Sequence, residues 1–71
     1  MSTRRFDERD TNDVKELNEK LSGLTVDVYG YLRDKDEHLV GNLSYDRYRQ
    51  AWVLTTYVMY KHANLALQSS N

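Results

Sequence analysis

The segment YDRYRQAWVLTTYVMYKHANLAL, residues 45–67, contains five of the eight aromatic residues and neither glycine nor proline. A continuous α-helix of this length would extend for about 34 Å, since each residue adds about 1.5 Å. Asp46 would lie in its first turn and Lys61 in its later part, where each charge suits the helix dipole. These features predict one long helix over residues 45–67.

The apolar residues of this segment fall on three stripes at helical spacing. The stripes are Tyr45, Tyr48, Trp52, Thr55, Met59 and Ala66; Ala51, Leu54, Val58 and Leu65; and Val53, Tyr57, Tyr60 and Leu67. The first two are adjacent, whereas the third lies on the far side and leaves the middle of the helix apolar nearly all round. Such a helix has to be enclosed, and the rest of the chain is too short and too charged to cover both sides. We therefore expect a second copy to cover it, so that two helical hairpins form a four-helix bundle.

A second helical pattern lies upstream. Its apolar residues are spaced 3, 4, 3, 4 and 3 positions apart, as Val14, Leu17, Leu21, Leu24, Val28 and Tyr31. Ser22 and Gly23 interrupt this stripe, and glycine within a helix costs about 1 kcal/mol relative to alanine. Gly41 and Ser44 suit the end of one helix and the start of the next. The sequence predicts an all-α fold, an antiparallel helical hairpin, with three helices if the chain breaks near residues 22–25.

The alternative is an α+β fold with a central β-hairpin at residues 25–43. Residues 24–32 are rich in β-branched and aromatic side chains, and Val26 and Val28 alternate with their neighbours, which is typical of a strand. The turn of this hairpin would be at residues 34–37. The helical interpretation is favoured because the phase of the apolar stripe continues through the glycine without a slip.

Composition divides the chain into three parts. Residues 1–10 carry six charges and, after Met1, one apolar side chain, Phe6, which predicts a disordered or frayed arm. Residues 11–68 form the single helical domain, and residues 69–71 form a polar tail. A domain of this size buries only about 60% of the surface that its unfolded chain exposes, and a chain without cysteine has no disulfides to help it. Oligomerisation is the remaining aid, which again predicts a homodimer.

The first ten residues contain no apolar run, so no secretion signal is predicted. The longest apolar-leaning run, residues 51–60, is about half of the roughly 20 residues that a membrane span needs. We expect a cytoplasmic protein with no membrane partner.

No catalytic or cofactor motif occurs in the sequence. The three glycines are too far apart for a phosphate-binding loop. His38 and His62 have no companion at ligand spacing, and Ser44 is explained as a helix cap. The acidic group Asp34, Asp36 and Glu37 is interpreted as a solvated helix end or turn instead of a cation site. We predict a protein that is not an enzyme and has no cofactor and no metal.

The leading functional hypothesis is a small adaptor, inhibitor or regulator that binds proteins as a homodimer. Tyrosine, tryptophan and methionine are enriched at the centres of protein interfaces. The residues predicted to lie at an interface, with a second copy or with a target protein, are Tyr48, Trp52, Tyr57, Met59 and Tyr60.

The alternative is a small nucleic-acid-binding regulator. Arg47 and Arg49 alternate with tyrosines at the start of the second predicted helix, and Lys61 lies further along it. Basic residues bind phosphates and aromatic rings stack on bases. This alternative is less favoured because the formal net charge is −1 and the basic residues are few.

Overall fold

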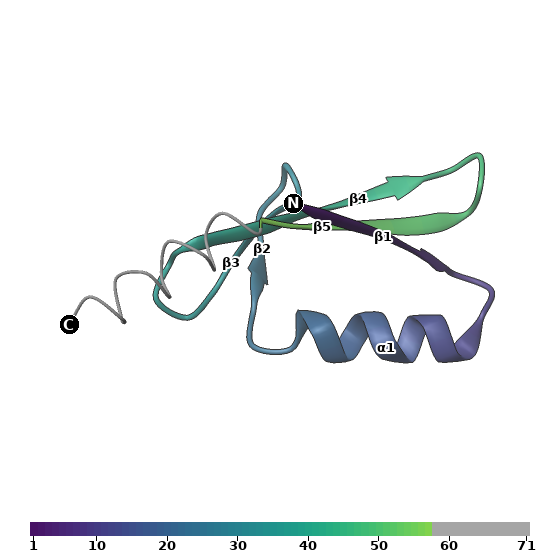
Figure 1. Cartoon of the computed structure of the whole chain (residues 1–71), viewed down its shortest axis with the longest axis horizontal. Coiled ribbons are helices and arrows are strands. Elements are labelled where there is room, and N and C mark those ends of the chain that lie inside the picture. The colour runs from purple at the N-terminus through teal and green to yellow at the C-terminus, as the bar shows by residue number, and fades with distance from the viewer. Residues whose placement is uncertain (58–71) are drawn as a thin grey trace.

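The computed structural model describes residues 1–57. They form five β-strands and one α-helix in the order β1 (Ser2–Asp7), α1 (Thr11–Leu21), β2 (Thr25–Val26), β3 (Tyr31–Arg33), β4 (Leu39–Asp46) and β5 (Ala51–Thr56). The strands make one antiparallel sheet with the spatial order β1-β5-β4-β3-β2. The helix lies along one face of this sheet (Figure 1). The first and last strands are therefore neighbours, and β1 and β2 are the two edges.

This sheet corrects the predicted all-α hairpin and four-helix bundle. Residues 45–57 are the end of β4, a turn and β5, while the rest of the predicted second helix lies outside the described residues. Side chains alternate between the two faces of a strand, so Leu54 faces α1 while Val53 and Thr55 face away. Because β5 carries apolar residues on both of its faces, the same residues fall on more than one apolar stripe when the segment is interpreted as a helix. Ser44, which we expected to cap a helix, lies within β4.

The upstream helical pattern corresponds to α1, but only as far as the Ser-Gly pair. Asp10 caps the helix, because its side chain accepts hydrogen bonds from two backbone amides of the first turn. Leu17 is buried on the side facing the sheet. Gly23 has a φ of +81°, in the left-handed region that ends helices. The expected continuation of the stripe past this glycine is wrong: Val28 lies exposed in a turn.

Residues 1–10 contain an edge strand where we expected a disordered or frayed arm. Phe6 of β1 is fully buried and lies opposite Trp52 of β5. Arg4 forms an ion pair with Glu16 of α1, and its guanidinium lies 4.6 Å from the centre of the Phe6 ring. The charged residues of this segment thus belong largely to an edge strand, and the ion pair between Arg4 and Glu16 joins that strand to α1.

The core lies between α1 and the sheet. Phe6, Leu17, Leu32 and Leu54 are its buried members, and the half-buried residues packed against them are Leu21, Leu24, Val40, Leu43 and Trp52. A helix is about 10 Å wide and neighbouring strands are about 4.8 Å apart, so one helix covers about two strands. Within residues 1–57, α1 is the only helix, so it covers part of one face of the sheet.

Each of the three hairpin turns begins with an aspartate. Asp27 Oδ1 accepts hydrogen bonds from the backbone amides of Tyr29 and Tyr31, at 2.9 and 3.0 Å. Asp34 Oδ1 accepts hydrogen bonds from the backbone amides of Asp36 and His38, at 2.9 and 3.0 Å. Asp46 Oδ1 accepts hydrogen bonds from the backbone amides of Tyr48 and Arg49, at 3.0 and 3.2 Å. Aspartate side chains stabilise turns in this way. The acidic group at residues 34–37 is thus a turn, as in the alternative hairpin, but a second turn at residues 27–30 divides that hairpin's first strand into β2 and β3.

These turn contacts predict a loss of stability in acid. Partial burial alone raises the pKa of Asp27, but hydrogen bonds from the Tyr31 amide, the Arg33 guanidinium and the Tyr29 amide outweigh it, so this pKa lies below its ordinary value of 3.8. Hydrogen bonds from the Arg49 amide and guanidinium likewise lower the pKa of Asp46. A carboxyl group with a lowered folded-state pKa stabilises the fold above its unfolded pKa and loses that contribution as the pH falls through its folded pKa.

We expect the free energy of unfolding to fall once the pH drops below about 3.8, and Asp27→Asn to make this fall shallower. Urea denaturation at about pH 7 and about pH 3, followed by circular dichroism, measures both quantities. An Asp27→Asn protein that loses as much stability in acid as the unmodified chain would contradict the role given to Asp27.

Candidate functional site

The turn between β2 and β3 carries two apolar side chains that point into solvent. Val28 is 93% exposed and Tyr29 is 80% exposed. The backbone beneath them is fixed, because the Asp27 amide donates to the Tyr31 carbonyl at 3.1 Å and the Gly30 amide donates to the Asp27 carbonyl at 3.0 Å. The turn therefore presents Val28 and Tyr29 from a defined backbone.

Gly30 anchors this turn to β4. Its carbonyl accepts a hydrogen bond from the Leu43 amide at 2.7 Å. Its φ is +91°, and a Cβ at this position would lie 2.3 Å from the Leu43 carbonyl oxygen. An ion pair between Arg33 Nη1 and Asp27 Oδ2 at 3.1 Å supports the other side of the turn. Both the turn and its position on the sheet are thus specified by local contacts.

The sheet has an open face, opposite to α1. Residues directly opposite each other in adjacent strands share a face, so the register places on it Thr3, Arg5, Tyr31, Asn42, Ser44, Val53 and Thr55. The hydroxyl oxygens of Thr3 and Thr55 lie 3.4 Å apart across the β1–β5 pair. No helix among residues 1–57 covers this face, and the turn at residues 27–30 stands above the sheet on the same side (Figure 1).

Exposed apolar residues are frequent in this part of the chain. Of the eight large apolar side chains that are exposed within residues 1–57, five lie between residues 26 and 39: Val26, Val28, Tyr29, Tyr31 and Leu39. Val28, Tyr29 and Tyr31 belong to the turn or directly follow it, whereas Leu39 lies opposite Arg33 at the other end of β3. Apolar side chains held in water add little to folding, whereas a cluster of them is typical of a protein-binding surface. An aromatic side chain on a fixed backbone also loses little entropy when it binds.

The turn at residues 46–50, at the tip of the β4–β5 hairpin, displays a further tyrosine. Tyr48 is 94% exposed. Of the two arginines predicted to contact nucleic acid, Arg49 is bonded to Asp46 at 3.1 Å, while Arg47 is exposed without an ion pair within residues 1–57. The positive charge at this tip is therefore small, and nucleic-acid binding stays a prediction.

The adjoining β1–α1 loop adds charges of both signs to this end of the sheet. The Glu8 amide donates to the Gln50 carbonyl at 3.1 Å, which joins the loop to the hairpin tip. Arg9 is bonded to Asp7 at 3.0 Å. A hydrogen bond between Glu8 and the Tyr45 hydroxyl raises the pKa of Tyr45. Acids and bases balance here, which differs from the basic surface that nucleic acids require.

Of the predicted interface residues, the three that the structure describes, Tyr48, Trp52 and Tyr57, lie in different places. Tyr48 lies at the hairpin tip, and Trp52 is half-buried on the face toward α1, with its ring 4.9 Å from that of Tyr45. Tyr57 follows the other end of β5, and its amide donates to the Val40 carbonyl at 3.0 Å. Met59, Tyr60 and Lys61 lie outside the described residues.

Sequence reasoning missed Val28 and Tyr29 as surface residues. The available signal was the tetrapeptide Asp27-Val28-Tyr29-Gly30, because aspartate at the first position and glycine at the fourth are typical of a type I turn. Val28 and Tyr29 then occupy the two central positions of the turn, which point outward. The helical stripe instead assigned Val28 to a buried face.

The turn between β3 and β4 brings Asp34, Asp36 and His38 together, with side-chain ligand atoms within 4.8 Å of one another. Asp34 Oδ1 is already bonded to two backbone amides of this turn, and its Oδ2 lies 3.6 Å from His38 Nδ1. The contacts that build the turn account for this proximity.

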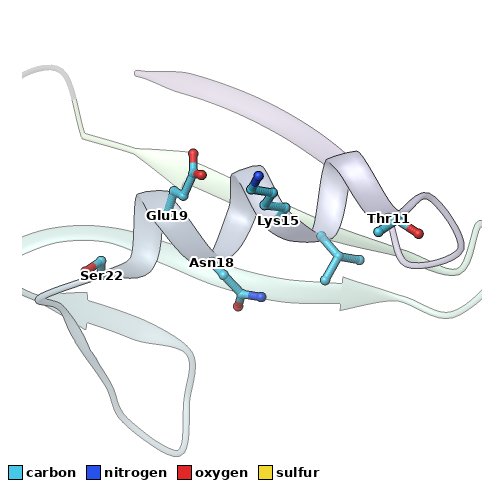
Figure 2. Close-up of a pocket in the computed structure, with 6 residues that line it drawn as sticks. Thr11, Lys15, Asn18, Glu19 and Ser22 are labelled. Atoms are coloured by element: carbon cyan, nitrogen blue, oxygen red, sulfur yellow. The ribbon is translucent and has the colours of Figure 1, made fainter.

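Two hollows in the described surface differ in their walls. The larger runs along one flank of α1 and is lined only by residues of α1 and its C-terminal cap, including Lys15, Asn18 and Glu19 (Figure 2). With a single element as its wall, it is a shallow surface feature. The smaller hollow, with a volume of about 300 Å³, lies between the end of α1 and strands β3, β4 and β5.

Within residues 1–57, no helix has the length and apolar content to cross a membrane. Comparisons of the chain with models of protein families, with curated proteins and with solved structures gave no match. The functional assignment accordingly rests on the geometry of the chain itself.

Proposed function

We propose that this chain is a non-enzymatic protein-binding protein that acts as a homodimer, with the open face and the turn residues Val28 and Tyr29 at the dimer interface. The observation that carries the proposal is the exposure of these two apolar side chains on a turn that is fixed to the sheet. Adaptor, inhibitor and regulator are the roles that fit such a protein. We place it in the cytosol, since a chain without cysteine needs no oxidising compartment to fold.

A second copy of the chain fits the open face for two reasons. The core of residues 1–57 is thin, with four buried apolar residues in the cluster between α1 and the sheet, and small domains commonly gain stability by association. The net charge of −1 also leaves little repulsion between two copies.

The position of the turn suggests the symmetry of the dimer. It stands above the open face at one side of the sheet. Two open faces brought together about a two-fold axis would place each turn against the partner's sheet, and both contacts would be identical. The hairpin tip with Arg47 and Tyr48 would stay free for a target protein.

The oligomeric state tests this proposal. We expect light scattering after size exclusion, over a hundredfold range of concentration, to show a dimer that dissociates only at the lowest concentrations. The double variant Val28→Ser with Tyr29→Ser should be monomeric at concentrations at least about tenfold above the dissociation point of the unmodified chain, because it removes the apolar area buried by the turn. Circular dichroism should show that its fold is retained.

Tyr48→Ser is the matched control, since it removes another highly exposed tyrosine from a different aspartate-based turn. It should leave the dimer unchanged. A monomeric unmodified chain, or a Val28 and Tyr29 double variant that dimerises as tightly as the unmodified chain, would overturn the proposal.

A further inference from the structure

We infer that the hollow between the end of α1 and the sheet binds a free medium-chain carboxylate, a ligand with one anionic group and a short alkyl chain. The hollow has a volume of about 300 Å³. Its apolar lining residues are Leu24, Leu32, Val40 and Leu54, and its polar lining residues are Lys20, Thr55 and Thr56. Thr55 belongs to the open face by register, but the apolar lining residues belong to the core cluster or pack against it on the side toward α1. Ligand binding in the hollow therefore does not require the proposed homodimer.

The fold produces this hollow because one helix cannot cover five strands. The helix ends at Leu21, and the chain turns at Gly23 before it reaches β2 at the opposite edge of the sheet. The half-buried residues Leu24 and Val40 pack against the core there without closing the space over β3 and β4. An apolar ligand body would remove more of these side chains from water.

Lys20 specifies the charge of the ligand. It lies in the last turn of α1, and it forms no ion pair within residues 1–57. The alkyl stem of a lysine can lie along apolar surface while its ammonium group stays in water. A carboxylate at the rim would meet this ammonium group and the Thr56 hydroxyl, while the alkyl chain enters the hollow.

The hollow is small for a ligand pocket. Its volume of about 300 Å³ is at the lower end of the range for such pockets, so we choose a small ligand of about ten non-hydrogen atoms. Octanoate has this size. A membrane lipid would have to leave its bilayer and is much larger, so we assign the site to a free carboxylate.

The single tryptophan provides a signal for the experiment. Trp52 packs against the same core cluster as Leu24 and Val40, so ligand binding should change its fluorescence. Titration of the full chain with octanoate should give a saturable change, confirmed by calorimetry. Octanol, which has the same chain without the charge, should bind more weakly.

Two variants separate the charge from the cavity. Lys20→Gln should weaken octanoate binding about fivefold, as expected for a partly solvated ion pair, and leave octanol binding unchanged. Lys15→Gln, on the other hollow of the same helix, should change neither. Val40→Phe should fill the hollow and abolish the binding of both ligands.

The inference would be overturned by the absence of saturable octanoate binding to the unmodified chain, or by full binding to Val40→Phe. Equal affinity for octanol and octanoate, or an effect of Lys15→Gln as large as that of Lys20→Gln, would overturn the assignment of the carboxylate to Lys20. Neither result depends on whether the chain is a dimer, since the oligomeric state is measured in a separate experiment.

Discussion

Phe6→Ala is expected to lower the free energy of unfolding by about 3–5 kcal/mol, the usual cost of removing a buried phenylalanine side chain. Phe6 is fully buried in the core cluster and joins the edge strand β1 to the helix and to β5. Domains of this size have a total stability of only about 4–10 kcal/mol. The variant should therefore lose a large part of its total stability, and urea denaturation with far-UV circular dichroism should show its unfolding transition at a much lower urea concentration.

Two variants control for the chemistry of this change. Phe6→Leu keeps an apolar side chain in the core and should cost less, about 1–2 kcal/mol. Tyr48→Ala removes an exposed aromatic ring and should change stability by no more than about 0.5 kcal/mol. If Phe6→Ala were as mild as Tyr48→Ala, β1 would contribute nothing to the fold, and the charged arm inferred from composition would be the better description.

Gly30→Ala is the second large effect, and we expect a loss of at least about 3 kcal/mol in the free energy of unfolding. Two causes add at this position. The φ of +91° is unfavourable for a residue with a side chain, and the new Cβ would lie 2.3 Å from the backbone oxygen of Leu43. Neither the turn nor β4 can move away without losing the hydrogen bond between the Leu43 amide and the Gly30 carbonyl. Chemical denaturation measures the loss.

The other two glycines separate these causes. Gly23 has a φ of +81°, and a Cβ added there would have nothing within 4 Å, so Gly23→Ala should cost about 1–2 kcal/mol from backbone conformation alone. Gly41 lies outside the left-handed region, but its Cβ would be 2.3 Å from the Thr55 carbonyl oxygen, so Gly41→Ala tests the steric clash alone. A Gly30→Ala variant no less stable than Gly23→Ala would show that the turn is not packed on β4, and would remove the fixed backbone beneath Val28 and Tyr29.

The first helix could be predicted because its signals are local. Val14, Leu17 and Leu21 repeat at helical spacing, and the Ser-Gly pair that follows is where α1 ends. The error was to treat the stripe as stronger evidence than Gly23. A glycine in the left-handed region stops a helix regardless of the phase of the residues beyond it.

Residues 45–56 were predicted wrongly because their apolar residues were matched to the repeat of a helix instead of the two-residue repeat of a strand. A helix that is apolar nearly all round is an uncommon solution, whereas Val53, Thr55 and Thr56 are β-branched and favour strands. The segment becomes a strand by pairing with β1, where Trp52 lies opposite Phe6. Residues that far apart in the chain leave no periodic signal that links them.

In the candidate site, too, local turn residues could be predicted from the sequence, whereas the exposure of their neighbours could not. The aspartate and glycine of the turn at residues 27–30 were readable as turn residues, but the exposure of Val28 and Tyr29 was not. Trp52 was rightly noticed as a large aromatic residue, yet it packs against the core, since α1 lies on that face of the sheet. Which aromatic side chain is covered depends on the element opposite it.

The sequence by itself determined the features that arise within a few residues: the apolar face of the helix, the glycine that ends it, the aspartates that build the turns, and the small size that limits the core. Tertiary structure alone decided that residues 2–7 and 51–56 are strands, that the first and last strands pair, and that one face of the sheet stays open within residues 1–57. The physical reason is that helices and turns complete their hydrogen bonds with near neighbours, whereas a strand completes them with a partner that may be far away in the chain.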